Sequence, residues 1–163
     1  SILDVCTGSG CIAISLAKLG VPRRVDATDL SEKALDIAGK NAKKLEADVT
    51  FYQGDLLENI SEKYDIIVSN PPYIASKVIG GLMPEVRDFE PMEALDGKED
   101  GLYFYRKIIG QCKQYLNPEG HLLFEIGYDQ GQKVSALMRE IGFHDVQVIK
   151  DLARKDRVVT GML

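Results

Sequence analysis

Short apolar runs alternate along the chain with segments whose apolar residues recur at helical spacing. Residues 2–6 form an apolar run followed by a glycine-rich turn, and residues 11–20 show helical spacing that ends at Gly20. Residues 23–30 predict a second strand, and residues 31–45 predict a helix. The expected apolar face of this second helix is made of Ala34, Ala38, Ala42 and Leu45.

The alternation continues through the rest of the chain. The further predicted elements are strands at 49–54 and 64–70, a helix at 100–116 that ends before Asn117, a strand at 120–127, a helix at 130–142, and strands at 144–151 and 157–163. Residues 74–98 show no clear period and contain Pro84 and Pro91, so we expect a long loop there. Long loops are uncommon in compact domains and often carry function.

Repeated strand–helix units predict an α/β fold, in which a parallel sheet has helices on both faces. The last two strands are separated by too few residues for a crossover helix, so we expect a C-terminal antiparallel hairpin. With 163 residues, the chain is long enough for one domain, residues 1–163, with a full core. It opens at Ser1, inside an apolar run, and we expect a fragment whose N-terminal part is missing.

Composition and charge narrow the function classes. The net charge is −5, so no general attraction to nucleic acid is expected. No apolar run reaches transmembrane length and no signal peptide opens the chain, so no membrane partner is expected. Cys6, Cys11 and Cys112 form no CxxC pair, which favours reduced thiols and a cytoplasmic location. His121 and His144 are isolated, so no catalytic metal site is expected.

A glycine-rich turn, "DVCTGSGCIA", links the first strand to the first helix. Gly8, Gly10 and Ala13 fit the pattern G-x-G-x-x-A. The two glycines let the backbone turn tightly and approach a ligand, with N–H groups at the helix N-terminus facing it. This fingerprint is compatible with either a dinucleotide or S-adenosylmethionine, because both present a ribose at that place.

Three carboxylates near this turn are candidate ligand contacts. Asp29 ends the second strand, where a carboxylate typically binds ribose hydroxyls; the alternative is a helix-capping role, which Ser31 can fill instead. Asp55 follows the third strand and could meet an adenine amino group with Leu56 against the ring, or could cap the next turn. Asp4 could orient the glycine turn, lie near a ligand amine, or make only a loop hydrogen bond.

The fourth strand runs into Asn70-Pro71-Pro72-Tyr73. Ligands of open parallel sheets bind at the carboxyl ends of the strands, where the winding direction switches, so Asn70 should lie beside the glycine turn. A residue before proline is extended, and Pro71 and Pro72 fix their φ angles and donate no hydrogen bond. The Asn70 side-chain oxygen and the Pro71 carbonyl can then point at one place, and Tyr73 offers a flat face to a planar group.

Such a pair of acceptors suits a planar –NH2 nucleophile, either a carboxamide or an exocyclic base amine. Its nitrogen is weak because the lone pair is delocalised, as the amide rotation barrier of about 18–20 kcal/mol shows. Two acceptors on its N–H groups favour a pyramidal nitrogen and stabilise the positive charge that develops as it attacks a sulfonium methyl group. No strong general base is needed. The alternative is a proline-rich loop that only ends a strand.

Several segments together resemble the release factor glutamine methyltransferases, over all 163 residues in order. The segments are "ILDVCTGSGCIAISLA", "DATDLS", "GDLL", "SNPPYI", "PEVRDFEPMEALDGKEDGLYFYRKI", "HLLFEIG" and "DLARKDRVV". The Asn-Pro-Pro-Tyr motif is shared with amino methyltransferases that act on adenine and on other amides. The long segment from "PEVR" to "YRKI" is more specific to the glutamine enzymes.

The resemblance implies a Rossmann-like class I methyltransferase that uses S-adenosylmethionine to methylate N5 of the glutamine in the Gly-Gly-Gln loop of class I peptide release factors. It also implies an N-terminal helical domain, absent here, and a cysteine at position 6 departs from the glycine of many members. Carried over by position, the implied contacts are the donor loop Cys6, Thr7, Gly8, Ser9 and Gly10, the ribose contact Asp29, the adenine contacts Asp55 and Leu56, and the glutamine site Asn70, Pro71, Pro72 and Tyr73, with Asn70 also bordering the donor.

The acidic segment 74–100 bears on the rival interpretations. It holds three basic and seven acidic residues, whereas phosphate-rich partners depend on basic contacts, so a protein substrate is favoured. We expect Glu90 and Pro91 to border the substrate channel. The rivals are an adenine-N6 methyltransferase of nucleic acid with the same site, an NAD-dependent oxidoreductase, and a cofactor-binding module without activity. A monomer is the default expectation, and Glu125, in an apolar strand, is expected to face the strand end without an assigned role.

Overall fold

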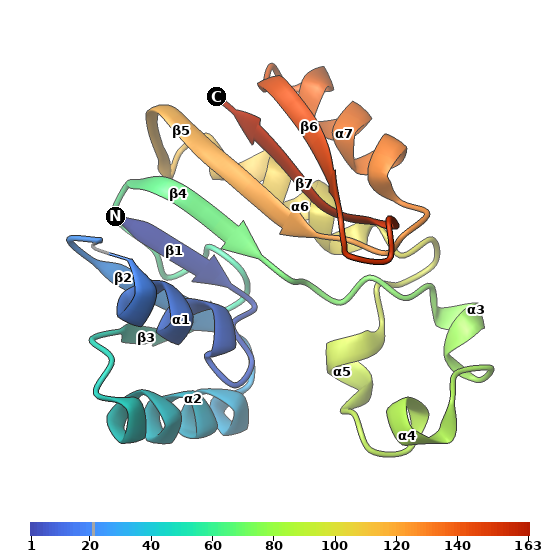
Figure 1. The fold of residues 1–163 in the computed structure, drawn as a ribbon, viewed down its shortest axis with the longest axis horizontal. Coiled ribbons are helices and arrows are strands. Elements are labelled where there is room, and N and C mark those ends of the chain that lie inside the picture. The colour runs from blue at the N-terminus through green and yellow to red at the C-terminus, as the bar shows by residue number, and fades with distance from the viewer. Residues whose placement is uncertain (21) are drawn as a thin grey trace.

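The computed structural model describes residues 1–20 and 22–163, which form a seven-stranded sheet of order β3-β2-β1-β4-β5-β7-β6 (Figure 1). The strands are β1 (Ile2–Val5), β2 (Val25–Asp29), β3 (Thr50–Gln53), β4 (Tyr64–Ser69), β5 (Leu116–Glu125), β6 (His144–Lys150) and β7 (Asp156–Met162). Strands β3, β2, β1, β4 and β5 pair in parallel, and β7 is antiparallel to both β5 and β6. The predicted mostly parallel sheet with a C-terminal antiparallel hairpin is confirmed.

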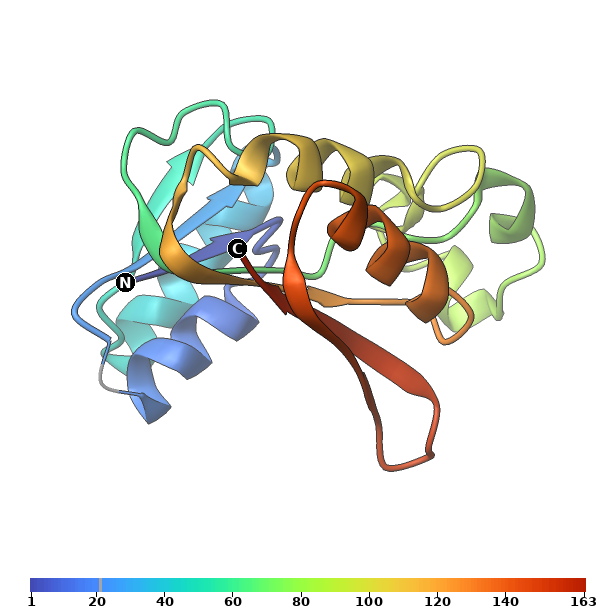
Figure 2. The ribbon, with the colours of Figure 1, turned by 90° about the horizontal axis from the view of Figure 1, so that it is seen from above.

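Helices lie on both faces of this sheet (Figure 2). They are α1 (Cys11–Leu19), α2 (Glu32–Leu45), α6 (Tyr103–Cys112) and α7 (Gly131–Glu140). The short helices α3 (Ser76–Ile79), α4 (Pro84–Arg87) and α5 (Met92–Leu95) lie apart from the sheet (Figure 1). Successive residues of a strand point to opposite faces. Ile2 therefore packs in the cluster of α1, whereas Leu3 packs in the larger cluster of α6 and α7.

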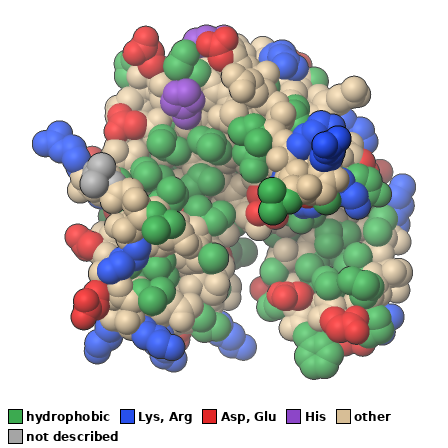
Figure 3. Space-filling model, in the orientation of Figure 1, with side chains coloured by type: hydrophobic (Ala, Val, Ile, Leu, Met, Phe, Trp, Pro, Cys, Tyr) green, Lys and Arg blue, Asp and Glu red, His purple; other side chains and the backbone are tan. Residues whose placement is uncertain are grey.

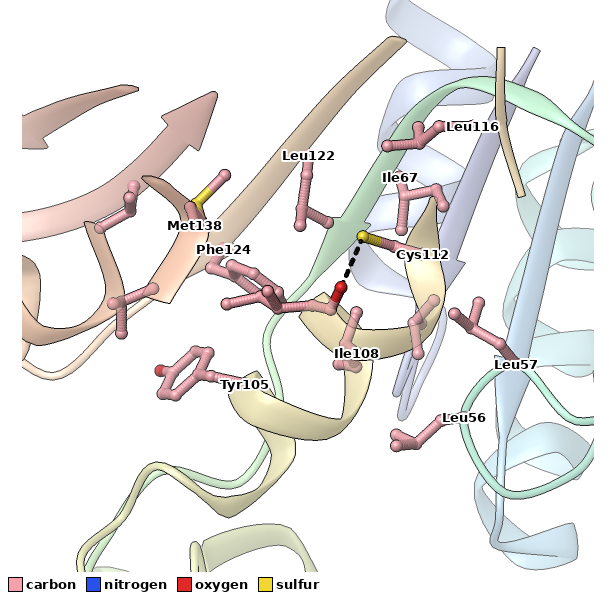
Figure 4. Packing of buried hydrophobic residues seen from close by; sticks show 14 of the residues in the cluster. Leu56, Leu57, Ile67, Tyr105, Ile108, Cys112, Leu116, Leu122, Phe124 and Met138 are labelled. Carbon is pink, nitrogen blue, oxygen red and sulfur yellow. Dashed lines mark hydrogen bonds between the residues drawn. The ribbon is translucent and has the colours of Figure 1, made fainter. Parts of the chain in front are cut away.

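The larger cluster forms the main core, between the sheet and helices α6 and α7 (Figure 4). Tyr105 and Phe124 pack edge to face there, with ring centroids 5.1 Å apart. Cys112 is buried among them, its thiol donates to the Ile109 carbonyl at 3.3 Å, and burial raises its pKa to about 12. Cys112 is therefore a core residue and not a reactive thiol.

Three expectations about local structure are wrong. Residues 74–98 are not a plain loop but contain the one-turn helices α3, α4 and α5, which are too short for a periodic signal. Helix α6 ends at Cys112, and Leu116 belongs to β5, because it pairs with Tyr64 of β4 and is buried in the core. Leu45, expected on the apolar face of α2, is 51% exposed; the buried residues of this helix are Ala38 and Ala42.

Two glycines allow a matched test of this packing. At Gly10 φ is +83°, and a Cβ would lie 2.9 Å from the Ile14 Cδ1 and 3.1 Å from the Ala38 Cβ. We expect Gly10→Ala to lower the free energy of unfolding in a urea titration by about 1–3 kcal/mol. Gly39→Ala, inside α2 with nothing within 4 Å, should raise it by roughly 0.5–1 kcal/mol. Equal effects of the two substitutions would contradict this packing.

Candidate active site

The sheet brings two loops together at the carboxyl ends of its central strands. From β1 the strand order continues through β2 to β3, and from β4 it continues through β5, so the winding direction switches between β1 and β4. Val5 and Ser69, the last residues of these strands, are register partners, and the Ser69 hydroxyl donates to the Val5 carbonyl at 2.6 Å. The loops that begin at Cys6 and Asn70 therefore start side by side, as the strand pattern predicts.

Both loops line one cavity of about 460 Å³. The members of the predicted site that line it are Cys6, Thr7, Gly8, Ser9, Asp29, Asp55, Leu56, Asn70, Pro71, Pro72 and Tyr73. Gly10 is not in the wall; it is the N-cap of α1 and packs against Ala38 of α2. The structure thus brings all but one of these residues around a single hollow, which opens between the body of α1 and α2 and the segment α3–α5 (Figure 3).

The glycine turn leaves room for a ligand next to its backbone. At Gly8 φ is +57°, the residue lines the cavity, and a Cβ built there would meet nothing within 4 Å. Cys6 also has a positive φ of 62°, a conformation that glycine adopts at lower cost than cysteine. Burial raises the pKa of the Cys6 thiol to about 12, so this cysteine stays neutral in the wall.

Asp4 holds the glycine turn through hydrogen bonds. Its Oδ2 accepts hydrogen bonds from the Thr7 hydroxyl at 2.6 Å and from the Ala13 N–H at 3.1 Å, which ties the turn to the start of α1. Burial raises the pKa of Asp4 to about 6, although both hydrogen bonds oppose the shift. Its Oδ1 is buried and has no hydrogen-bond partner within the described residues. Asp4 therefore orients the glycine turn through loop hydrogen bonds.

Asp29 connects the turn to the second helix. Its Oδ2 accepts from the Gly8 N–H at 2.8 Å, and its Oδ1 accepts from the Ser31 N–H at 2.9 Å. The cap of α2 is Ser31, whose hydroxyl oxygen accepts from the Ala34 N–H at 3.3 Å. Asp29 is thus not the helix cap, and its half-buried carboxylate faces the cavity.

Asp55 and Leu56 form another part of the wall. The exposed Asp55 carboxylate receives no hydrogen bond from any described residue, so it does not cap the following turn. Leu56 has a φ of 55° and is only 7% exposed, and its carbonyl accepts from the Thr28 hydroxyl at 2.9 Å. The backbone there is fixed while the Asp55 side chain stays available.

The Asn-Pro-Pro-Tyr loop presents two unused acceptors. Asn70 is exposed at the cavity, and Pro71 next to it is buried. Among the described residues, neither the Asn70 carboxamide nor the Pro71 carbonyl has a hydrogen-bond partner. Tyr73 is half-buried against the main core, and burial raises the pKa of its phenol, with the nearby Glu125 adding to the shift. Glu125 is the last residue of β5 and so lies at the strand end, as expected.

A buried glutamine, which the sequence gives little reason to single out, holds this loop in place. The Gln130 Nε2 donates to the carbonyls of Tyr73 at 3.0 Å and Gly101 at 3.2 Å, and its Oε1 accepts from the Gly127 N–H at 2.9 Å. A Cβ at Gly101 would overlap the Tyr73 carbonyl oxygen, and one at Gly97 would lie 2.8 Å from the Tyr73 Cα. These two glycines in "DGKEDG" are the only sequence signal of the close contact.

A further part of the wall comes from the segment that follows the loop. Glu90, Pro91, Glu93, Ala94 and Leu95 line the cavity. Two backbone hydrogen bonds join the start of this segment to its end. The Ile74 N–H donates to the Leu95 carbonyl at 3.0 Å, and the Gly97 N–H donates to the Ile74 carbonyl at 2.8 Å. The described wall contains four carboxylates, Asp29, Asp55, Glu90 and Glu93, and no lysine or arginine. The cavity therefore favours a cationic ligand.

Two further findings concern the described residues as a whole. Within residues 1–20 and 22–163, no group of three or more His, Cys, Asp or Glu side chains is placed to hold a metal ion. None of the helices in this described part of the chain is both long enough and apolar enough to cross a membrane.

The chain is similar to known proteins along nearly its whole length. The chain is 45% identical over 166 residues to a release factor glutamine methyltransferase of Clostridium acetobutylicum, covering 99% of this chain and 58% of that protein. It is 42% identical over 164 residues to the enzyme of that name from Geobacter sulfurreducens, covering 100% of this chain and 58% of that protein. The chain thus spans less than two thirds of the length of these relatives.

Solved structures share the fold at lower sequence identity. A methyltransferase from Pyrococcus furiosus superposes with a TM-score of 0.76 at 19% identity, over 99% of this chain and 73% of that one. A 16S rRNA N2 G1207 methyltransferase of T. thermophilus, solved with AdoMet and guanosine, superposes with a TM-score of 0.67 at 17% sequence identity. The match covers 99% of this chain and 36% of that one. The family model of the methyltransferase small domain matches residues 1–83 of the 163. The chain therefore belongs to the methyltransferase small domain family.

Proposed function

We propose that residues 1–163 are the S-adenosylmethionine-dependent catalytic domain of a methyltransferase that modifies N5 of the glutamine in the Gly-Gly-Gln motif of class I peptide release factors. The observation that carries this proposal is the pair of unengaged acceptors, on Asn70 and Pro71, at the edge of a cavity built on the glycine turn. The proposed substrate is taken from the names of the relatives, release factor glutamine methyltransferases that are 42–45% identical to this chain along nearly its whole length.

The residues present fit S-adenosylmethionine. The cavity of about 460 Å³ lies within the usual range for small-ligand sites, roughly 300–1,000 Å³. The open side of Gly8 admits a ligand to the backbone. Asp29, Asp55 and Leu56 line the same cavity, which supports assigning Asp29 to the ribose hydroxyls and the other two to the adenine. S-adenosylmethionine, when bound, supplies an electrophilic methyl group on a positively charged sulfur. The four carboxylates of the wall suit that charge.

Asn70 and Pro71 act on the nucleophile. The two acceptors bind the N–H groups of the substrate carboxamide, which orients its nitrogen and stabilises the positive charge that develops on it during attack. The prolines hold the acceptors stiffly, and Gln130 fixes the far end of the loop at Tyr73. Because the two acceptors have no hydrogen-bond partner among the described residues, no bond to those residues has to break before they bind the amide.

An adenine-N6 methyltransferase is the second candidate, because the Asn-Pro-Pro-Tyr site suits an exocyclic base amine equally well. The described cavity wall lacks lysine and arginine, which disfavours a polyphosphate substrate. Competition by DNA or methylation of an adenine oligomer would support this candidate over the first.

Transfer to the glutamine can be located directly. When the full chain is incubated with purified release factor and labelled S-adenosylmethionine, we expect mass spectrometry to find one added methyl group on the glutamine of the Gly-Gly-Gln motif. A release factor with that glutamine replaced by alanine is the control and should take up no label. Label on another residue, or only on the adenine oligomer, would overturn the proposed substrate.

The role of Asn70 predicts a loss confined to the chemical step. We expect Asn70→Ala to lower turnover on release factor by roughly 10²–10³-fold, like the loss of one oxyanion-hole group. The affinity for S-adenosylhomocysteine, measured by calorimetry, should change much less. Gln132→Ala, an exposed amide on α7, serves as the control and should keep normal turnover. Near-normal turnover of Asn70→Ala would remove Asn70 from the mechanism.

The donor site can be tested without turnover. We expect S-adenosylhomocysteine, but not NADH, to raise the melting temperature, and at a hundred times its Kd to add about 2.7 kcal/mol to the free energy of unfolding. Asp55→Ala should weaken its binding by roughly 3- to 10-fold, the loss of one hydrogen bond, without lowering the stability of the free protein. Glu58→Ala, three residues further on, is the control and should leave this affinity unchanged. Stabilisation by NADH instead would favour an oxidoreductase.

A further inference from the structure

The segment of residues 74–98, called the rim lobe here, stands out from the body of the protein. It carries α3, α4 and α5 and lies across the cavity from α1 and α2 (Figures 1 and 3). Besides the backbone bonds at its base, the Ser76 hydroxyl donates to the Asp96 Oδ1 at 2.6 Å, and the Lys98 N–H donates to the same oxygen at 2.9 Å. The rim lobe is therefore held to the end of the Asn-Pro-Pro-Tyr loop as a defined unit.

Apolar side chains are unusually exposed on the rim lobe. Phe89 is 84% exposed, Met83 68% and Met92 58%. Large apolar side chains gathered at one place on a surface mark sites of interaction. None of these three side chains lines the cavity, but Phe89 directly precedes the wall residue Glu90, and Met92 stands between the wall residues Pro91 and Glu93.

The charges of the rim lobe are also unbalanced. Arg87 is paired with Asp88 at 2.7 Å, and Lys98 is paired with Asp96 at 3.2 Å. In the described part of the chain, Glu85, Glu90 and Glu93 have no such partner, and each lies within two residues of an exposed apolar side chain. The one lysine of the rim lobe without such a partner, Lys77, lies on α3 and not beside these apolar residues in the chain. A complementary partner therefore presents apolar side chains with lysine or arginine around them.

We propose that Met83, Phe89 and Met92 form the surface on which the protein substrate docks, against an apolar patch with a basic rim beside the methylated glutamine. This inference rests on the proposed function, because the partner is the release factor itself. Glu90 and Pro91, which stand between Phe89 and Met92 in the chain, line the same cavity as Asn70, so a protein seated on these apolar residues has its neighbouring loop beside the site. Docking of this kind supplies uniform binding energy, which lowers KM and leaves kcat unchanged.

The double variant Phe89→Ser/Met92→Ser tests the surface in the full chain. We expect KM for the release factor to rise about 10- to 100-fold, with kcat and the Kd of S-adenosylhomocysteine unchanged. The matched control is Leu19→Ser/Leu152→Ser, whose leucines are 88% and 107% exposed on α1 and beyond β6, away from the cavity wall. The control should leave KM unchanged.

Charge and direct binding complete the test. Glu85→Gln should weaken the dependence of KM on salt concentration, because one charge of the docking surface is lost. Calorimetry measures the affinity for a release factor whose target glutamine is replaced by alanine. This affinity should fall in the double variant by the same factor as KM rises.

Each outcome has a distinct meaning. An unchanged KM and unchanged binding in the double variant would overturn the docking surface while leaving the proposed function intact. The docking surface would likewise be overturned if the double variant altered only the self-association of the chain in light scattering, since a second copy would then occupy the surface. If the wild-type chain binds release factor through these residues but never methylates it, the docking surface stands and the proposed function fails.

Discussion

The site depends on the parallel pairing of β1 with β4. Their register ends at Val5 opposite Ser69, and a hydrogen bond from the Ser69 hydroxyl to the Val5 carbonyl closes it. Both strands are central and largely buried, so a shift in register would move their apolar residues to the wrong face of the sheet. The starting points of the glycine turn and of the Asn-Pro-Pro-Tyr loop are therefore set by the most constrained part of the core.

The residues that fix each loop are not the ones proposed to carry out the chemistry. Asp4 and Asp29 hold the glycine turn through its N–H and hydroxyl groups, and Gln130 holds the other loop by the Tyr73 carbonyl. The groups proposed to do the chemistry, the Asn70 carboxamide and the Pro71 carbonyl, carry none of this structural role within the described chain. Such a division leaves both acceptors free for a substrate amide, and water satisfies the exposed Asn70 carboxamide until substrate replaces it.

Electrostatics link the cavity to the rim lobe. Carboxylates from the second strand, the turn after β3 and the rim lobe surround one hollow, and the described wall contains no basic side chain. The same sign of charge suits a cationic methyl donor inside and a basic protein surface outside. In the proposed docking, the exposed Phe89 and Met92 add apolar contact area to the attraction between the charges.

The sequence by itself determines the order of strands and helices, the switch point, the Ser31 cap and the identity of the two acceptors, because periodicity, turn residues and proline restrictions are local properties. Only the tertiary structure decides that Leu116 joins a strand, that Leu45 stays exposed and that the rim lobe contains three short helices. It alone also reveals Gln130, whose hydrogen bond to Tyr73 spans 57 residues. The short helices are missed because one turn is too short to show a period. The other features depend on partners far away along the chain, and a local pattern carries no record of which distant group a side chain will meet.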